Sequence, residues 1–361
     1  MVERALARVS RAAIEANCSL LRSKLAGGAE LCAVVKAGGY GHGAVEAARA
    51  ALRGGAGWIA VATAGEAAEL RAAGIEARLL VMGALTPRDL DTALSADADI
   101  AVWTSELLEA AGASARVHVK LDSGMGRLGT KDEREALALC DRAAERDQLA
   151  GVWTHFATAD EVDDDHFNDQ LDKFKRVVAE VKSRHPGTIA HAANSAATLR
   201  DRASHFDLVR CGVAIYGLDP FQRDPDEQGL TPALGLHSYV AAVKRFEPGE
   251  SAGYGRTWKA AAPTWVATIP VGYGDGWRRA LSNNADVLIR GRRYPLVGTI
   301  SMDNLTVDLG PETVVEPGDD VVLIGSQGEE RILAEEVARR LGTINYEVTC
   351  GIGRRVRYLH E

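Results

Sequence analysis

The chain has 361 residues, of which 46% are hydrophobic and 25% are charged. This length favours two domains, and the composition is that of an ordinary globular protein, which excludes the disordered and fibrous classes. The 42 basic and 50 acidic residues give a net charge of −8. This balance argues against a nucleic-acid or membrane-surface partner, because binding a phosphate backbone generally needs a basic face.

The cysteines and the apolar segments indicate the compartment. Five scattered cysteines without a C-x-x-C pair predict reduced, mostly buried thiols, and we expect neither disulfides nor a metal site. The N-terminal sequence MVERALARVSR lacks an apolar stretch of signal-peptide length. No later stretch approaches the roughly 20 apolar residues of a membrane span. We therefore expect a cytoplasmic protein.

Short apolar, β-branched runs alternate with Ala-rich segments that are good helix formers between residues 30 and 217. Strands that are apolar throughout, each followed by a helix, are typical of a parallel sheet covered on both faces. The pattern predicts an α/β fold with an N-terminal TIM-type (β/α)₈ barrel over residues 9–231, although a doubly wound open sheet has the same local pattern. The eight runs are 31–35, 58–62, 78–82, 99–103, 117–121, 149–156, 188–194 and 208–217.

The pattern of apolar and polar residues changes at about residue 232. Helical periodicity fades, and short alternating strands are separated by turns such as EPGE, NNAD and EPGD. These features predict a second, mostly β domain over residues 232–361, to which residues 1–8 are an optional addition. One late helix is expected in the segment LAEEVARRLG.

Polar residues follow several of the predicted barrel strands, where reactive side chains of such barrels stand. Lys36 comes directly after LCAVV, where desolvation would lower its pKa and favour the neutral amine that forms a Schiff base. A lysine that snorkels to solvent fits the same position. Polar groups on four further strand ends favour a site, because each would otherwise need its own buried partner. They are Lys120, Asp122, Arg127, His155, His191, Asn194, Ser195 and Arg210.

The segment AVVKAGGYGHG resembles the cofactor-lysine motif of alanine racemases, and the resemblance continues along nearly the whole chain in the family's order. It implies a pyridoxal 5′-phosphate-dependent amino-acid racemase, with alanine as the expected substrate and D-alanine supplied for peptidoglycan. The family's fold, a (β/α)₈ barrel followed by a β domain, agrees with the fold predicted above. The other similar segments are KLDSGMGRLG, THFATAD, ANSAA, VRCGVAIYGL, GYGRTW, PVGYGDGW, VGTISMDN and YEVTCGIGRRV.

The resemblance implies two bases. Lys36 would bind the cofactor and then act on one face of the substrate Cα, and Tyr254 would act on the opposite face. Racemisation needs this pair, because one group removes the proton and a different group returns it from the other side. A free tyrosine has a pKa of about 10, so Tyr254 would need neighbouring positive charge. Arg210 matches the arginine that faces the pyridine nitrogen, leaves it unprotonated and so discourages side reactions.

The remaining site residues also follow from the resemblance. The phosphate would be bound by Tyr40, Ser195 and the backbone N–H groups of Gly212 and Val213, with Asn194 adjoining. His155 would lie against the cofactor ring, and His191 would support Arg210.

For the substrate, the carboxylate would be received by Arg127 and the backbone at Met302. Lys120 matches a lysine that is often carbamylated and orients Arg127. Tyr273 and Asp303 match residues of the entrance. In the family the residues matching Tyr254, Tyr273, Met302 and Asp303 come from the partner subunit, which implies a homodimer with shared sites.

Several positions depart from the family pattern. Gly38 and Gly39 stand where Asn and Ala are usual, which is expected to loosen that loop. Ser301 replaces a frequent cysteine beside Met302. Arg354 stands where many members have a tyrosine that touches the phosphate, so either Arg354 supplies a charged contact or that contact is lost.

Three other functions share part of this pattern. A barrel-type amino-acid decarboxylase would be expected to place an acidic residue where Arg210 stands. A non-catalytic pyridoxal-phosphate carrier can be a lone barrel, without a β domain that offers a second base. A racemase of broader scope, acting on serine, lysine or arginine, would differ mainly in pocket volume, where one methylene changes discrimination by about 1–3 kcal/mol.

Overall fold

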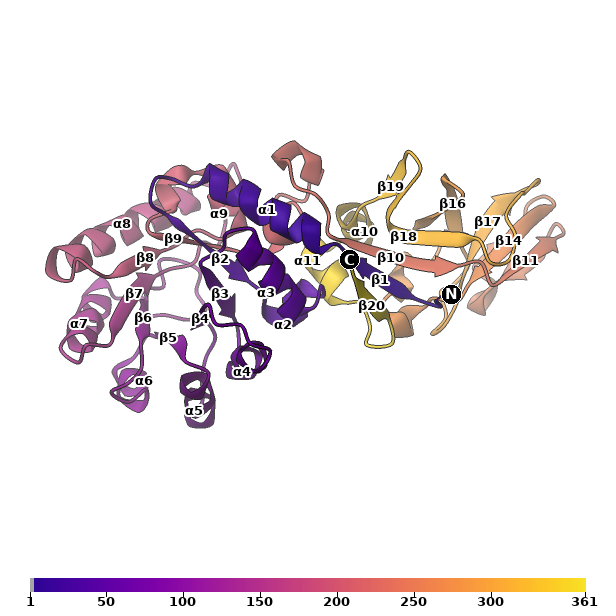
Figure 1. The fold of residues 1–361 in the computed structure, drawn as a ribbon. Helices are drawn as coiled ribbons and strands as arrows, with labels where there is room; N and C mark the ends of the chain where they lie inside the picture. Colours follow the sequence, from indigo (N-terminus) through magenta and orange to yellow (C-terminus); the bar gives the residue numbers. More distant parts are fainter. Residues whose placement is uncertain (1–2) are drawn as a thin grey trace. The chain divides into compact units, whose positions relative to one another are not determined.

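The computed structural model describes residues 3–361. The chain forms two compact units, which we call the barrel unit and the β unit (Figure 1). The barrel unit comprises residues 14–221 and 228–231, and the β unit comprises the N-terminal residues up to Ala13, residues 222–227 and residues 232–361. Of the segment 1–8 considered above, Met1 and Val2 lie outside the described residues.

The barrel unit contains a closed barrel of eight parallel strands, which confirms the predicted (β/α)₈ architecture and excludes the open sheet. Closure comes from the pairing of the first strand with the last, for instance of Cys32 with Arg210. The strands are β2 (Glu30–Val34), β3 (Trp58–Val61), β4 (Arg78–Val81), β5 (Ala98–Val102), β6 (Val117–Lys120), β7 (Leu149–Trp153), β8 (Ile189–His191) and β9 (Leu208–Cys211).

The helices of the barrel unit surround the strands (Figure 1). Small side chains let them pack closely: the buried residues of α3 are all alanines. Capping boxes at Thr63 and Thr86 begin α4 and α5, as their sequences require. The helices are α1 (Arg11–Lys24), α2 (Lys36–Tyr40), α3 (Ala44–Arg53), α4 (Ala64–Ala72), α5 (Pro87–Ser95), α6 (Ser105–Ala110), α7 (Glu133–Ala144), α8 (His166–Arg184) and α9 (Ser195–Arg200). Short 3₁₀ turns of this unit are η1 (Arg202–Ser204) and η2 (Val213–Tyr216), whereas η3 (Pro225–Gln228) belongs mostly to the β unit.

The β unit is built on one large sheet, in the order β11-β14-β17-β16-β15-β18-β10-β1-β20. The N-terminal strand β1 pairs antiparallel with β10 and parallel with β20, so the two ends of the chain lie side by side in this sheet. The strands are β1 (Leu6–Val9), β10 (Leu234–Tyr239), β11 (Ala242–Phe246), β12 (Ser251–Ala252), β13 (Trp258–Lys259), β14 (Thr264–Ile269), β15 (Asp286–Ile289), β16 (Arg292–Val297), β17 (Leu305–Gly310), β18 (Asp320–Gln327), β19 (Glu330–Ile332) and β20 (Arg357–His360).

The late helix expected in LAEEVARRLG is present as α10 (Ala334–Leu341), which ends at Gly342 in a left-handed conformation. A second helix, α11 (Asn345–Cys350), follows it and was not predicted, because six residues are too few for an apolar periodicity. The other 3₁₀ turns of this unit are η4 (Tyr254–Arg256), η5 (Tyr273–Asp275) and η6 (Arg279–Leu281).

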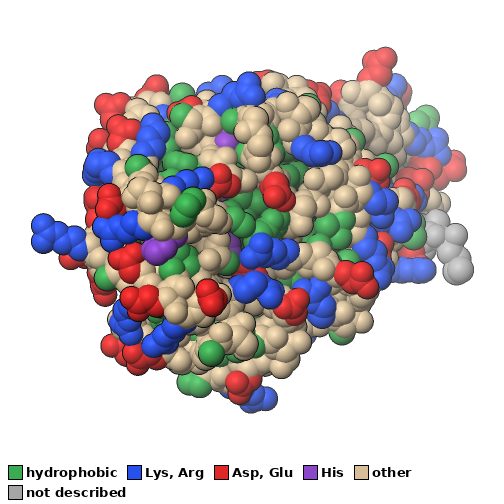
Figure 2. Space-filling model, turned by 60° about the vertical axis from the view of Figure 1, so that its left-hand side comes forward, with side chains coloured by type: hydrophobic (Ala, Val, Ile, Leu, Met, Phe, Trp, Pro, Cys, Tyr) green, Lys and Arg blue, Asp and Glu red, His purple; other side chains and the backbone are tan. Residues whose placement is uncertain are grey.

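Surface and cysteine features agree with the composition. Figure 2 shows acidic and basic side chains interspersed over the face that it draws. Four cysteines are buried and Cys350 is exposed, and all five are free thiols. Within residues 3–361, no helix combines the length and the apolar character needed to cross a bilayer.

Candidate active site at the carboxyl end of the barrel

Lys36 lies two residues beyond the end of β2, at the start of a left-handed turn. The φ angles of Ala37, Gly38, Gly39 and Tyr40 are 53°, 62°, 66° and 53°. Glycine adopts this conformation at little cost, so the two glycines suit the turn. The carboxylate of Glu66 at the start of α4 accepts the N–H of Ala37 at 2.6 Å, which ties the turn to the next βα loop.

Arg210 on β9 is buried, with 2% of its surface exposed. Its guanidinium donates to the carbonyl oxygens of Thr154 (2.8 Å) and Ala192 (3.0 Å). It also contacts Nδ1 of His191 at 2.8 Å and Nδ1 of His155 at 3.1 Å. Burial lowers the pKa of Arg210 to about 10, so it remains cationic at neutral pH. This buried cation is therefore bound by carbonyl oxygens and imidazole nitrogens, and none of these acceptors is a carboxylate.

The residues expected at the phosphate come together from three loops. Ser195 Oγ accepts the N–H groups of Gly212 (3.0 Å) and Ala214 (3.3 Å). Asn194 caps α9 by accepting the N–H of Ala197 at 2.9 Å. A Cβ built on Gly212 would lie 2.3 Å from the hydroxyl of Tyr40, so only glycine lets this tyrosine reach the backbone beside Val213. The five residues predicted to bind the phosphate therefore lie next to one another.

Lys120 and His155 stand among several positive charges. Lys120, at the end of β6, is 2% exposed, and its ammonium lies 4.2 Å from the ring centroid of Trp153. Burial, followed by the charges of Arg210 and Arg127, lowers the pKa of Lys120 to about 7.

The pKa of His155 is lowered well below its ordinary value by burial and then by Arg210, Arg127, Lys120 and Lys36. The predicted lysines, arginines and histidine of the barrel therefore lie within electrostatic reach of one another. Asp122, also noted in the sequence, instead accepts the N–H groups of Gly124 and Gly126 and so holds the loop that carries Arg127.

The four predicted residues of the β unit lie on adjoining loops of that unit. Tyr254 in η4 is 72% exposed and lines a hollow of about 370 Å³ together with Ser301 and Thr299. The N–H of Tyr273 donates to the carbonyl of Ser301 at 3.1 Å, and Met302 is 52% exposed.

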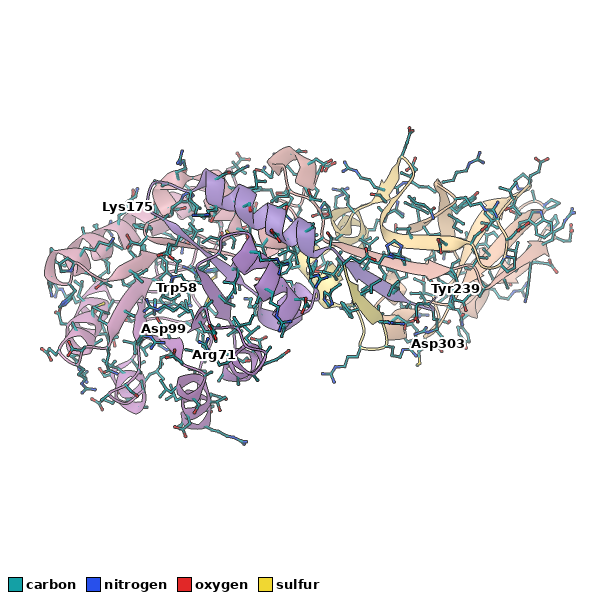
Figure 3. All side chains as sticks on the ribbon, in the orientation of Figure 1. Trp58, Arg71, Asp99, Lys175, Tyr239 and Asp303 are labelled. Carbon is teal, nitrogen blue, oxygen red and sulfur yellow. The ribbon has the colours of Figure 1, made fainter. Side chains whose placement is uncertain are left out.

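Asp303, labelled in Figure 3, accepts a hydrogen bond from Arg355 at 2.8 Å. The same guanidinium lies 3.2 Å from the buried carboxylate of Asp275 and so connects the loops of Met302 and Tyr273. Arg355 was not assigned from the sequence, where it belongs to a run of C-terminal arginines. Arg354, next to it, is exposed.

Sequence reasoning missed three further residues of the barrel site. Glu66 stands at the third position of a capping box, a signal that predicts its bonds to α4 but not its bond to the Lys36 turn. Trp153 stacks on His191 with ring centroids 5.5 Å apart and lies under Arg210. His118, in the run VHVKL, contacts His191.

Comparisons with known proteins cover both units. Residues 9–220 match the model of "Alanine racemase, N-terminal domain", and residues 233–360 match "Alanine racemase, C-terminal domain". An alanine racemase of Geobacillus kaustophilus is 45% identical over 358 residues, which cover 95% of this chain and 91% of the relative. The relative from Geobacillus stearothermophilus is 44% identical, with coverage of 97% and 92%.

Solved structures are similar over the full length. The alanine racemase of E. faecalis superposes with a TM-score of 0.93 at 37% identity and covers 100% of both chains. That of Bacillus anthracis, solved with bound L-Ala-P, has a TM-score of 0.89 at 37% identity, covering 100% of this chain and 96% of its own.

Proposed function

The chain belongs to the alanine racemase family and racemises alanine, and we propose that it does so with pyridoxal 5′-phosphate and two bases, Lys36 and Tyr254. The observation that carries this mechanism is the bonding of Arg210, a buried cation without a carboxylate among its acceptors. A cation at this position disfavours protonation of a pyridine nitrogen that faces it.

The residues present fit this cofactor. The close approach of Tyr40 to Gly212 and the N-terminal turn of α9 form a small, polar cradle suited to a phosphate group. Lys36 would hold the aldehyde carbon through its amine, and Arg210 would lie at the pyridine nitrogen with His155 against the ring. When bound, pyridoxal phosphate withdraws electrons from the substrate Cα and makes its proton acidic enough to be removed.

The chain's own residues move the proton. Lys36 would exchange protons with one face of Cα, and the hydroxyl of Tyr254 with the other, which inverts the configuration when the two act in turn. Met302 and Arg127 would receive the substrate carboxylate and thereby orient Cα between the two bases.

Lys120 would carry a carbamate that orients Arg127. Carbamate formation requires a neutral amine as the nucleophile, and the lowered pKa of Lys120, about 7, supplies one at neutral pH. The charge of Arg127, which helps to lower that pKa, would then face an anion.

The active site would be shared between the two subunits of a homodimer. Tyr254, Tyr273 and Met302 are large apolar side chains that are 72%, 43% and 52% exposed. Exposed apolar groups that gather on adjoining loops are typical of a surface that meets another chain. Each β unit would therefore supply these side chains to the barrel of its partner.

A decarboxylase would need an acid at the pyridine nitrogen, where Arg210 stands, and a carrier would need no second base. The fit of side chains larger than alanine depends on the shared site of the dimer. The D-alanine formed would serve peptidoglycan synthesis in the cytoplasm.

Proton NMR of the cofactor-loaded protein with L-alanine in deuterated water tests the reaction. We expect loss of the Cα proton together with the appearance of D-alanine in chiral analysis, and the same experiment with serine, lysine and arginine measures the breadth of specificity. Cofactor bound at Lys36 without exchange would overturn the proposal.

The two-base assignment is tested by Tyr254→Phe. Removing one general acid–base group should lower racemisation by about 10²–10⁴-fold, while the visible absorbance of bound cofactor stays at the wild-type level. Normal racemisation in this variant would exclude Tyr254 as a base.

A further inference from the structure

A continuous chain of hydrogen bonds leads from Arg210 through the barrel interior to its amino end. His191 Nδ1 contacts the guanidinium of Arg210 at 2.8 Å, and its Nε2 contacts Nδ1 of His118 at 2.8 Å. Nε2 of His118 then contacts the carboxylate of Asp99 at 3.0 Å. Figure 3 labels Asp99, the second residue of β5.

The donor and acceptor roles in this series of hydrogen bonds follow from the groups at its two ends, Arg210 and Asp99. A guanidinium can only donate, so Nδ1 of His191 must be an acceptor and its proton must lie on Nε2. That proton needs Nδ1 of His118 as its acceptor, which leaves the His118 proton on Nε2. A carboxylate can only accept, and Asp99 takes this last proton. Both imidazoles are therefore neutral and carry their protons on Nε2.

The protonation states agree with this scheme. Burial lowers the pKa of both His191 and His118 below their ordinary value, so both are neutral near pH 7. Burial alone would raise the pKa of Asp99, but the hydrogen bonds from His118 and Arg116 and the charge of Arg78 bring it below its ordinary value. Asp99 is therefore an anion, and an anion can only accept.

The packing leaves these groups little freedom. His118, His191 and Asp99 are each 0% exposed. His191 stacks on Trp153, and the edge of Trp58 meets His118 with ring centroids 5.8 Å apart. A Cβ on Gly151 of β7 would lie 2.2 Å from His118 Nδ1, so the glycine makes room for the ring.

Two arginines at the amino end balance the charge of Asp99. Arg116 donates to Oδ1 at 2.6 Å and Arg78 lies 2.8 Å from Oδ2, and their side chains are 39% and 37% exposed. The carboxylate is thus paired with two partly solvated cations, and its Oδ2 accepts from His118 as well as from Arg78.

We propose that Asp99 is a positioning residue for Arg210: by accepting from His118 it stabilises the one direction of both imidazole hydrogen bonds in which His191 presents an acceptor to the guanidinium. With the direction reversed, His191 would turn an N–H toward an N–H of Arg210, and a buried donor would lose its partner. The orientation of Arg210 toward the cofactor then depends on a carboxylate at the opposite end of the barrel. The effect on catalysis rests on the role proposed for Arg210.

The experiment measures the tautomers directly. Histidine labelled with ¹⁵N in the ring gives two-bond proton–nitrogen correlations that distinguish Nε2–H from Nδ1–H, and spectra of His118→Gln and His191→Gln assign the signals. In the cofactor-free wild type we expect both histidines to be neutral with the proton on Nε2. A proton on Nδ1 of either ring, or a charged ring at pH 7, would overturn the proposal without any variant.

Asp99→Asn tests the role of the carboxylate. An amide can donate as well as accept, so only the Arg210 end still selects the direction of these hydrogen bonds, and the tautomers of His118 and His191 should become mixed. The kcat for alanine should fall roughly ten- to hundredfold, as for other groups that orient a reacting partner indirectly, while KM changes by less than about threefold.

Asp97→Asn is the matched control, because Asp97 also pairs with Arg116 (2.8 Å) but does not contact His118. Asparagine suits the φ of 50° at this position, so the tautomers and kcat should remain those of the wild type. Unchanged tautomers in Asp99→Asn, or equal changes in both variants, would contradict the inference. Ordered tautomers in a wild type that does not racemise alanine would refute the proposed function and leave the role of Asp99 standing.

Discussion

At the scale of single residues, burial decides the protonation of the basic groups in the barrel. Lys120 and Arg210 are both 2% exposed, and burial lowers the pKa of Lys120 to about 7 and that of Arg210 to about 10. Arg210 nevertheless stays charged at neutral pH, because the ordinary pKa of an arginine is higher than that of a lysine. The site therefore keeps a permanent cation at Arg210 and a lysine that can react as an amine.

The titration of Lys120 predicts a pH-dependent stability. Because its pKa is lowered from 10.5 to about 7, the unfolded state binds more protons between these values, and the free energy of unfolding should rise as pH increases from 7 toward 10. Lys120→Met removes this term, which amounts to a few kcal/mol. In carbonate-free urea titrations of the cofactor-free protein, the variant should be the more stable at pH 6, and the difference should shrink toward pH 10. Parallel curves for the two proteins would show that Lys120 does not titrate in this range.

Gly212 is predicted to be irreplaceable for a steric reason. An alanine Cβ would lie 2.3 Å from the hydroxyl and 2.7 Å from Cζ of Tyr40, which is buried and cannot move aside freely. We expect Gly212→Ala to cost about 1–3 kcal/mol of stability and to weaken retention of pyridoxal phosphate by about tenfold or more. The measurement is cofactor release during dialysis, followed by absorbance. Gly187→Ala is the control, because no atom lies within 4 Å of its Cβ, and equal release from both variants would rule out the steric explanation.

At the scale of elements, α4 does more than cover the barrel. The carboxylate of Glu66 accepts the N–H groups of Ala62 (2.9 Å) and Thr63 (3.0 Å) at its own N-terminus, besides that of Ala37 (2.6 Å). One side chain thus caps a helix and holds the turn that follows Lys36. The position of Lys36 is consequently tied to the start of the next helix.

Glu66→Gln tests this connection. A neutral amide is a weaker acceptor and offers one oxygen in place of two, so we expect a loss of about 1–3 kcal/mol in stability and faster hydrogen exchange at the amide of Ala37. Hydrogen–deuterium exchange measures the second effect. Glu69→Gln, on the exposed side of the same helix, should change neither, and wild-type protection of Ala37 in Glu66→Gln would contradict the connection.

At the scale of the whole molecule, the proposed dimer makes a quantitative prediction. Lys36→Ala and Tyr254→Phe should each be nearly inactive. If each site takes its lysine from one subunit and its tyrosine from the other, half of a randomly mixed population is heterodimeric, and one of the two sites in each heterodimer is intact. Mixing after unfolding and refolding together should therefore restore roughly a quarter of the wild-type racemase activity.

The alternative arrangement gives a different number. If both bases came from the same chain, every site in the mixture would lack one of them, and no activity would return. Sedimentation of the mixed sample provides the control that heterodimers have formed.

The sequence by itself determined the alternation of strands and helices in the barrel, the mostly β domain after residue 232 and the polar residues at the strand ends. These features depend on local periodicity and on the fixed direction of parallel strands, so they can be read along the chain. The similarity of its motifs also pointed to Tyr40, Ser195 and Gly212, which the structure brings together, and to Arg210 with the histidines that contact it.

Only the tertiary structure decided which distant groups meet. The contact of Asp99 with His118, the bond from Ala37 to Glu66 and the approach of Tyr40 to Gly212 join residues separated by 19, 29 and 172 positions. The pairing of β1 with β20 joins the two ends of the chain. Such contacts depend on barrel closure, strand register and the space left by single glycines, and none of these leaves a periodic trace in the sequence.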